Sequence, residues 1–209
     1  MLKVTLFFAA VAASAMAGDI QAGAQIYEPM AASVRAGLAA SVADDPAPRH
    51  GFSDATEAVA WLTEMSSRLD RRLPDYRTRL GFLRSVHYES TRAGLDSQIV
   101  LARIQVESHL RKYAVSSAGA RGFMQVMPFW VGLIGRRGDN LFDLRTNLRF
   151  GCAILKHYLD LEKGDLTRAL ARYNGSLGKP DYPNLVYRAM RLTWKYEQRP
   201  LNDKIASQG

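Results

Sequence analysis

Residues 106–128 read VESHLRKYAVSSAGARGFMQVMP and interrupt a chain that is otherwise patterned as helices. Just before the interruption, Ile104 and Glu107 fall on one helical face, so Glu107 is expected to point toward the interior or a cleft. A carboxyl group in apolar surroundings has its charged form disfavoured, which raises its pKa and suits a proton donor near neutral pH. Gly119 and Gly122 permit tight turns. The stretch therefore predicts an irregular loop after a helix that carries one candidate acid.

On both sides of this loop, apolar residues recur at helical spacing, and no alternating run is long enough to demand a sheet. Asp96 is placed to cap the helix that carries Glu107. The breaker-rich residues 44–51 indicate a linker. The expected helices cover residues 19–42, 53–69, 74–94, 96–107, 147–163, 165–173 and 184–196. The predicted class is all-α, with an N-terminal helical segment over 18–73 that includes the linker, a main domain over 74–198 and a tail over 199–209.

The N-terminus has the pattern of a cleavable secretory signal over residues 1–17. Lys3 precedes an apolar run over 4–13, and Ala15 and Ala17 form an Ala-x-Ala pair before the expected cleavage point. The run falls short of the ~20 residues that a membrane-spanning helix needs. No Cys stands at the cleavage point, so no lipid anchor is expected. We therefore expect a periplasmic protein without a stable membrane anchor; an uncleaved anchor is the alternative.

Composition narrows the classes of function. The chain has 209 residues, 28 Lys and Arg against 20 Asp and Glu, and a net charge of +8. This length is enough to bury a proper core. The single Cys excludes an intrachain disulfide framework and a Cys-clustered zinc site, and the four His show no metal-ligand spacing, so no cofactor or metal is expected. Cys152 lies on an apolar helix face and is expected to be buried.

Three ordered blocks of sequence resemble the lytic transglycosylases of the soluble-lytic-transglycosylase, goose-type-lysozyme-like family. The first joins Glu107-Ser108 to residues 116–128, SSAGARGFMQVMP. The second, residues 141–151, is similar to the family's connecting segment and its Asn-x-x-x-Gly helix start. The third, ARYNG at 171–175, is similar to its Tyr-Asn-Gly element. The resemblance covers about half of the chain; after the third block the sequence departs from the more common Asn-Ala-Gly.

The resemblance implies a lysozyme-like helical domain that cleaves the β-1,4 bond between N-acetylmuramic acid and N-acetylglucosamine in peptidoglycan. It implies 1,6-anhydro-muramic ends as product. It also implies that Glu107 is the single general acid and base, protonating the leaving oxygen and then accepting the proton of the C6 hydroxyl. The residues that the resemblance assigns to binding the sugar or shaping its site are Ser116, Met124, Gln125, Met127, Tyr173 and Asn174.

Two other functions stay open at this point. A muramidase-type hydrolase would need a second carboxylate, for which Asp139 and Asp143 are the nearby candidates. A catalytically inactive wall-binding or secretion-system scaffold would keep the fold without the reaction. Glu89-Ser90 repeats the Glu-Ser dipeptide without the downstream pattern, so Glu89 is expected to be a solvated helix carboxylate. The expected partners are peptidoglycan glycan strands, with a cell-envelope or secretion assembly left open and nucleic acid disfavoured.

Overall fold

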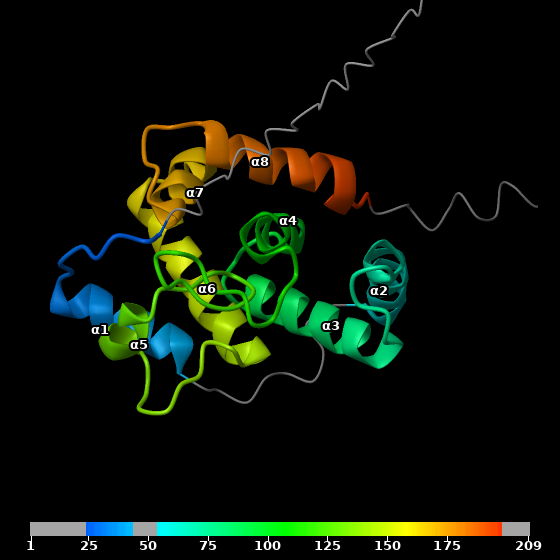
Figure 1. Ribbon diagram of the computed structural model, residues 1–209, viewed down its shortest axis with the longest axis horizontal. Coiled ribbons are helices and arrows are strands. Elements are labelled where there is room, and N and C mark those ends of the chain that lie inside the picture. The colour runs from blue at the N-terminus through cyan, green and yellow to red at the C-terminus, as the bar shows by residue number, and fades with distance from the viewer. Residues whose placement is uncertain (1–23, 44–53, 198–209) are drawn as a thin grey trace, which may run out of the picture.

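The computed structural model describes residues 24–43 and 54–197. These residues form eight α-helices, a π-helical turn and no strand, which confirms the all-α, lysozyme-like class (Figure 1). In chain order the elements are α1 (Ala32–Val42), α2 (Ala55–Leu69), α3 (Tyr76–Arg92), α4 (Ser97–Ser108), α5 (Phe129–Ile134), α6 (Leu144–Leu161), α7 (Leu166–Asn174), α8 (Asp181–Ala189) and the π-helical turn Met190–Trp194.

Aspartates begin five of the helices in the described part of the chain. Each Asp side chain accepts a hydrogen bond from a backbone amide in the first turn, a donor that helix geometry leaves free. The predicted cap of α4 is confirmed, because the Asp96 Oδ1 accepts from the Gln98 amide at 2.7 Å. The other four capping residues are Asp54 on α2, Asp75 on α3, Asp143 on α6 and Asp165 on α7.

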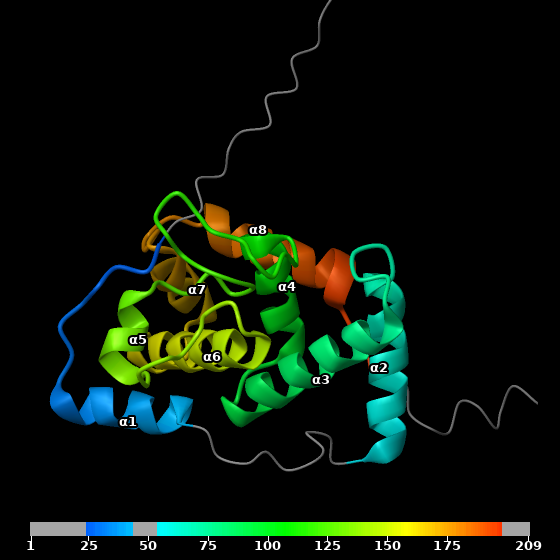
Figure 2. The same cartoon turned by 60° about the horizontal axis from the view of Figure 1, so that its bottom comes forward.

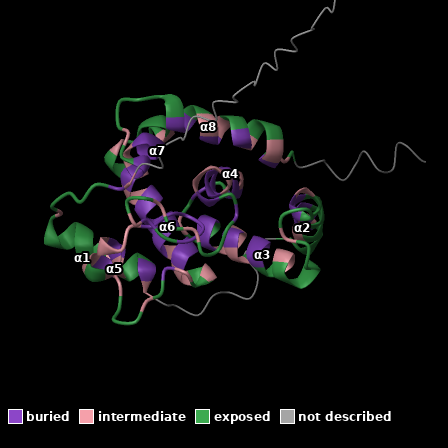
Figure 3. Cartoon of the chain, in the orientation of Figure 1, coloured by how far each residue is buried: buried purple, intermediate pink, exposed green. Residues whose placement is uncertain are grey.

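Helix α4 lies in the middle of the molecule, with other helices around it (Figure 1). It contacts α3 on one side, and α8 with its π-helical turn on another. Colouring by burial shows how little of α4 reaches the surface (Figure 3). A second view shows that α1 lies along α5 and α6 (Figure 2). In the same view, α2 packs against the N-terminal end of α3. A helix surrounded in this way should bury mostly apolar side chains, and α4 buries an unbroken apolar run over residues 99–102 together with Ile104. Arg103 stands between them as a fully buried charged residue.

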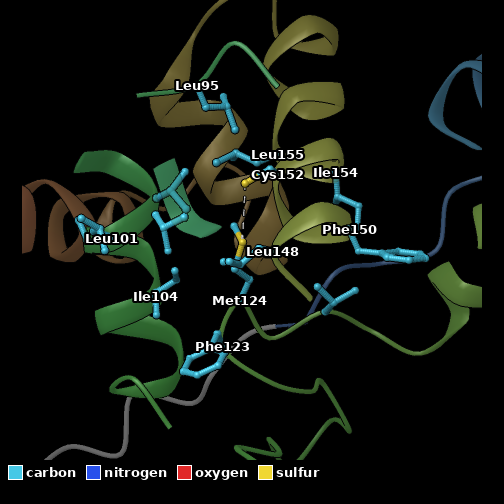
Figure 4. Packing of buried hydrophobic residues seen from close by; sticks show 14 of the residues in the cluster. Leu95, Leu101, Ile104, Phe123, Met124, Leu148, Phe150, Cys152, Ile154 and Leu155 are labelled. Carbon is cyan, nitrogen blue, oxygen red and sulfur yellow. Dashed lines mark hydrogen bonds between the residues drawn. The ribbon is translucent and has the colours of Figure 1, made fainter. Parts of the chain in front are cut away.

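The core joins α4 and α6 to the loop that follows α4. In Figure 4, Met124 of that loop lies close to Leu148 and Cys152 of α6, with Ile104 of α4 nearby. Met124 is fully buried, and its Sδ lies 4.0 Å from the Cys152 Sγ. Cys152 is 1% exposed, so the prediction of a buried small apolar residue is confirmed. The loop therefore contributes its own side chains to the core.

The first helix starts later than the periodicity predicts. Residues 24–31 precede α1 without helical structure, and we call them the strap. Pro29 disfavours the helical conformation of the residue before it, which explains why the helix does not extend back through the strap. Ile26 is 62% exposed, whereas Leu38 and Val42 are buried. The helix predicted over 19–42 is therefore wrong for residues 24–31 and right for Ala32–Val42.

Two further differences arise near the C-terminal half of the chain. The sequence analysis missed α5, a six-residue helix with a glycine inside it, because so short an apolar run has no readable period. Helix α8 begins at Asp181 instead of residue 184. Pro183 fits this earlier start, because a proline is tolerated in the first turn of a helix, where its missing N–H would have had no intrahelical partner.

Glu89 was predicted to be solvated, and this prediction was wrong. Its side chain is 2% exposed and pairs with Arg92, at 3.4 Å, and with Arg149, at 3.6 Å. Both arginines also donate to backbone carbonyls at the end of α1. Burial raises the pKa of Glu89, against the opposing effect of these arginines. The two guanidinium groups therefore tie this buried carboxylate on α3 to α6 and to the C-terminus of α1.

Several sequence predictions lie outside the described residues: the signal over 1–17, the linker near 44–51 and the tail over 199–209. Within the described residues, no helix combines the length and the apolar character that a membrane crossing requires.

Candidate active site

The loop that follows α4, residues 109–128, is here called the motif loop. Helix α4 ends where the backbone turns left-handed at two successive residues, His109 with φ 52° and Leu110 with φ 64°. Residues with a Cβ adopt this conformation at a cost, so tertiary contacts must hold it. Farther on, Arg121 and Val126 exchange two backbone hydrogen bonds of 2.9 and 3.0 Å. Glu107, in the last turn of α4, therefore stands at the start of a tightly folded loop.

Asn147, in the first turn of α6, holds the middle of the motif loop. Its Oδ1 accepts from the Met124 amide at 2.7 Å, and its Nδ2 donates to the carbonyls of Arg121, at 2.9 Å, and Leu141, at 2.8 Å. Gly151 lies one turn later on α6, where a Cβ would overlap the Met124 side chain. The Asn-x-x-x-Gly spacing thus has a physical reason: Asn147 fixes the backbone of Met124, and Gly151 leaves room for its side chain.

The carboxyl group of Glu107 accepts two hydrogen bonds on the same oxygen. The Arg103 Nη2, one turn earlier on α4, lies 3.1 Å from Oε1, and the Tyr182 hydroxyl on α8 lies 2.6 Å from it. The Glu107 side chain is 3% exposed. No hydrogen bond from the described residues reaches Oε2, and Oε2 is not among the polar atoms sealed from solvent. Glu107 is therefore held by one oxygen and keeps the other free.

Arg103 connects Glu107 to Met124 and Tyr173 of the sequence blocks. Its guanidinium carbon lies 3.3 Å from the centroid of the Tyr173 ring, and its Nη2 also donates to the Met124 carbonyl at 2.7 Å. The Tyr173 hydroxyl donates to the same carbonyl at 3.2 Å. Arg103 and Tyr173 are both fully buried. A cation over an aromatic face is stabilised by the ring quadrupole, the more so when water is excluded.

Burial dominates the protonation equilibria of this cluster. It raises the pKa of Glu107, while Arg103 and the hydrogen bond from Tyr182 act in the opposite direction. Burial also raises the pKa of Tyr173 to about 12 and that of Tyr182 well above its ordinary value. Both phenols therefore remain protonated near neutral pH and can donate hydrogen bonds. A carboxyl group with a raised pKa and a free oxygen can serve as a general acid.

The blocks that the sequence analysis identified therefore meet in space. Residues 84–183 match the family model described as the transglycosylase SLT domain. These residues, just under half of the chain, are therefore similar to the lytic transglycosylase family. The family resemblance drawn from the three sequence blocks is confirmed.

Curated relatives carry the same family name. The chain is 31% identical to "Membrane-bound lytic murein transglycosylase C" of Photorhabdus laumondii subsp. laumondii, over 54% of this chain and 34% of that protein. The protein of the same name from Cronobacter sakazakii is 31% identical over 54% of this chain and 34% of that protein. The one from Mannheimia succiniciproducens is 37% identical over 35% of this chain and 23% of that protein. The chain thus spans about a third or less of the length of these relatives. No solved structure matches it significantly.

The structure brings together three of the predicted site residues: Glu107, Met124 and Tyr173. The other four hold the surrounding loops. Gln125 is buried, and its Nε2 donates to the carbonyls of Ala114 and Gly122. Two of the others bond locally: the Ser116 Oγ accepts from the Ala120 amide, and the Asn174 Nδ2 donates to the Ser176 Oγ. The Met127 amide donates to the distant Gln25. Contact of any of these residues with a sugar stays a prediction.

Sequence reasoning missed three residues that contact this site. Arg103 precedes Glu107 by four positions, a spacing that places both on one helix face, so this pair could have been found. Tyr182 follows the Tyr-Asn-Gly block by a few residues, but nothing local shows that its hydroxyl reaches α4. Gln25 lies in the strap, 100 residues from its partner Gln125, and no sequence pattern predicts that contact.

The strap is hydrogen-bonded to the C-terminal end of the motif loop through Gln25. The Gln25 Nε2 donates to the Gln125 carbonyl at 2.9 Å, and its Oε1 accepts from the Met127 amide at 2.8 Å. Gln25 is 4% exposed. Gly175, the last residue of the Tyr-Asn-Gly block, has φ 74°, and a Cβ there would collide with the Ala24 carbonyl. The strap therefore contacts the first and the third sequence blocks, although it lies outside the residues that match the family model.

The two candidates for a second carboxylate have local roles. The Asp143 Oδ1 accepts from the Thr146 amide at 3.0 Å as the cap of α6, and the Asp139 Oδ2 accepts from the Arg136 amide at 2.8 Å. Over residues 24–43 and 54–197, no three His, Cys, Asp or Glu side chains come together in a way that could hold a metal ion.

Proposed function

We propose that the chain is a peptidoglycan lytic transglycosylase in which Glu107 is the single general acid and base. The observation that carries this proposal is the position of Glu107: it is buried at the point where the sequence blocks meet, held by Oε1 and free at Oε2. The match of residues 84–183 to the transglycosylase SLT domain supports the reaction class. The relatives named above are lytic murein transglycosylases by name, and murein is the substrate proposed here.

In the first step, the protonated Glu107 gives its proton to the oxygen between N-acetylmuramic acid and N-acetylglucosamine. The bond from C1 of the muramic residue to that oxygen breaks. The raised pKa supports this role, because it keeps a larger fraction of Glu107 protonated near neutral pH than an exposed glutamate would have. The carboxylate that forms is stabilised at once by the Arg103 and Tyr182 donors.

In the second step, the C6 hydroxyl of the muramic residue attacks C1 and gives its proton to Glu107. A 1,6-anhydro ring forms, and Glu107 returns to its protonated state. Hydrolases that use water commonly need two carboxylates, one of them to activate water or to attack the sugar. The local engagement of Asp139 and Asp143 supports a reaction that works with one carboxylate.

We further propose that the protein acts in the periplasm after removal of residues 1–17. The sequence pattern of these residues is the basis of this proposal. The full chain has a net charge of +8, and Lys3 is the only charged residue in 1–17, so the chain stays strongly basic after their removal. This charge suits attraction to a wall polymer that bears carboxylates on its lactyl groups and stem peptides.

Glu107→Gln tests the catalytic assignment. The substitution removes the transferable proton while keeping the shape, so the rate of release of soluble fragments from peptidoglycan should fall about 10²- to 10⁴-fold. Glu89→Gln is the matched control, because Glu89 is also a buried glutamate followed by serine but lies on α3, away from the cluster. Parent-like digestion by folded Glu107→Gln would rule out Glu107 as the catalyst.

A further inference from the structure

Arg103 is the unusual residue of the cluster. Arginine is rarely fully buried, and here it lies in the middle of the central helix with no exposed surface. Its Nη2 donates to both the Glu107 Oε1 and the Met124 carbonyl, whereas its Nε and Nη1 have no hydrogen-bond partner in the described part of the chain. Such unpaired buried donors are costly. A residue retained under those conditions needs a reason beyond packing, since an apolar side chain of similar length would fill the space.

The two donors to Glu107 converge on one oxygen and so distinguish its two oxygens. Oε1 lies 2.6 Å from the Tyr182 hydroxyl and 3.1 Å from the Arg103 Nη2. A proton placed on Oε1 would face both donors, so the acid proton belongs on Oε2. The same contacts fix the side chain, because Tyr182 comes from α8 and Arg103 from α4. The orientation of Oε2 is therefore set by the protein before a substrate binds.

We propose that Arg103 is a positioning residue of the reaction: with Tyr182 it holds Glu107 by Oε1, so that Oε2 gives the proton to the leaving oxygen and accepts the next one from the C6 hydroxyl. This inference rests on the proposed function. One oxygen thus serves both steps, and Glu107 need not rotate between them. The guanidinium charge also stabilises the carboxylate that exists between the two steps, when the C1–oxygen bond has broken and the anhydro ring has not yet closed.

The charge of Arg103 should be visible in the pH dependence of the reaction. The titratable and charged groups that face Glu107 are Arg103 on α4, Tyr173 on α7 and Tyr182 on α8, while the motif loop offers the Met124 carbonyl. Of these, only Arg103 carries a charge near neutral pH. An opposite charge at this distance lowers the pKa of a carboxyl group by about 1 to 3 units. Loss of the charge should therefore let Glu107 keep its proton to higher pH.

The test compares pH profiles of kcat/KM for formation of anhydro product in the parent, Arg103→Met and Arg103→Lys. In Arg103→Met, the limb on which activity falls at high pH should move upward by about 1 to 3 pH units, with kcat reduced more than KM is changed. Arg103→Lys retains a positive charge, so the high-pH limb of its kcat/KM profile should stay near that of the parent. Arg84→Met is the matched control, because Arg84 is exposed on α3 and its loss should leave the limb unchanged.

The outcomes separate the inference from the proposed function. A parent that forms no anhydro product contradicts the proposed function. The inference is overturned if the parent forms anhydro product and folded Arg103→Met has the same high-pH limb as the parent. Arg103 would then only hold the Met124 carbonyl in place. Arg103→Gln is the second neutral variant. It keeps a donor for that carbonyl, so the same shift is expected of it, and its limb decides the question if Arg103→Met does not fold.

Discussion

At the scale of single residues, the site depends on a carboxyl group whose environment opposes its ionisation. The Glu107 side chain is almost fully buried, and burial raises its pKa more strongly than Arg103 and Tyr182 lower it. A group suited to donate a proton near neutral pH is therefore also a group that destabilises the fold when it ionises. The same property that supports the reaction should appear in the stability of the protein.

The stability of Glu107→Gln should depend on pH differently from that of the parent. In the unfolded chain Glu107 titrates near its ordinary value of 4.5, and in the folded chain it titrates higher. Between these two values the folded chain holds a proton that the unfolded chain has released, so the parent loses stability as the pH rises. Glutamine does not titrate. The difference in Tm, variant minus parent, should therefore increase with pH across this window, and a constant difference would contradict the raised pKa.

Gly151→Ala tests the contact between α6 and the motif loop. A Cβ at this position would overlap the Met124 side chain, and α6 and the loop would have to separate. Overpacking of this kind costs about 1–3 kcal/mol of unfolding free energy. Gly81→Ala on α3 is the control: nothing lies within 4 Å of its Cβ, so it should be neutral or stabilising, by up to about 1 kcal/mol. Denaturant unfolding measures both, and equal effects of the two substitutions would refute the steric argument.

At the scale of elements, the motif loop is held from three directions. Asn147 of α6 fixes it at Met124, Arg103 of α4 donates to the same residue, and Gln25 of the strap bonds its far end. Only the first two supports lie within the residues that match the family model. The strap is therefore the support that is particular to the N-terminal part of this chain.

Gln25→Ala should loosen the far end of the motif loop. The substitution leaves the Gln125 carbonyl and the Met127 amide without their partner, which costs about 1–3 kcal/mol for buried groups. Hydrogen exchange at the Met127 amide should accelerate. Ile26→Ala is the neighbouring control, since Ile26 is 62% exposed and its truncation should change stability by less than about 0.5 kcal/mol. Unchanged exchange at Met127 in Gln25→Ala would show that the strap does not support the loop.

Features of the fold that depend on local contacts could be predicted from the sequence, and features that depend on distant contacts could not. Helices with a long apolar period, such as α4 and α6, begin and end within a few residues of their predicted ranges, and the Asp96 cap was readable because it is a local hydrogen bond. The contacts of the strap could not be predicted, because they join residues about 100 positions apart, and α5 could not because its apolar run is too short to show a period. In the site, Glu107 and Tyr173 could be assigned from the sequence blocks. The burial of Arg103 could not, since its residue type favours the surface.

At the scale of the whole molecule, the helices lie around α4 (Figure 1) and share one hydrophobic core. The Glu107 cluster lies toward the C-terminal end of α4. Helices α7 and α8 bring Tyr173 and Tyr182 to it, while α6 carries the supports of the motif loop. Glu89 and Glu107 are both buried and paired with arginine, but Glu107 keeps one oxygen that, among the described residues, is neither hydrogen-bonded nor sealed from solvent, as an acid that must reach a substrate requires. The architecture therefore favours an enzyme, and the position of one carboxyl group favours lytic transglycosylation.

Mass spectrometry of the fragments released from purified peptidoglycan tests this account most directly. The parent protein should release fragments that end in 1,6-anhydro-muramic acid, and Glu107→Gln should release few or none. Fragments with hydrated reducing ends would indicate a hydrolase, and an absence of fragments from the folded parent would indicate a wall-binding scaffold. Either of these two results would contradict the account.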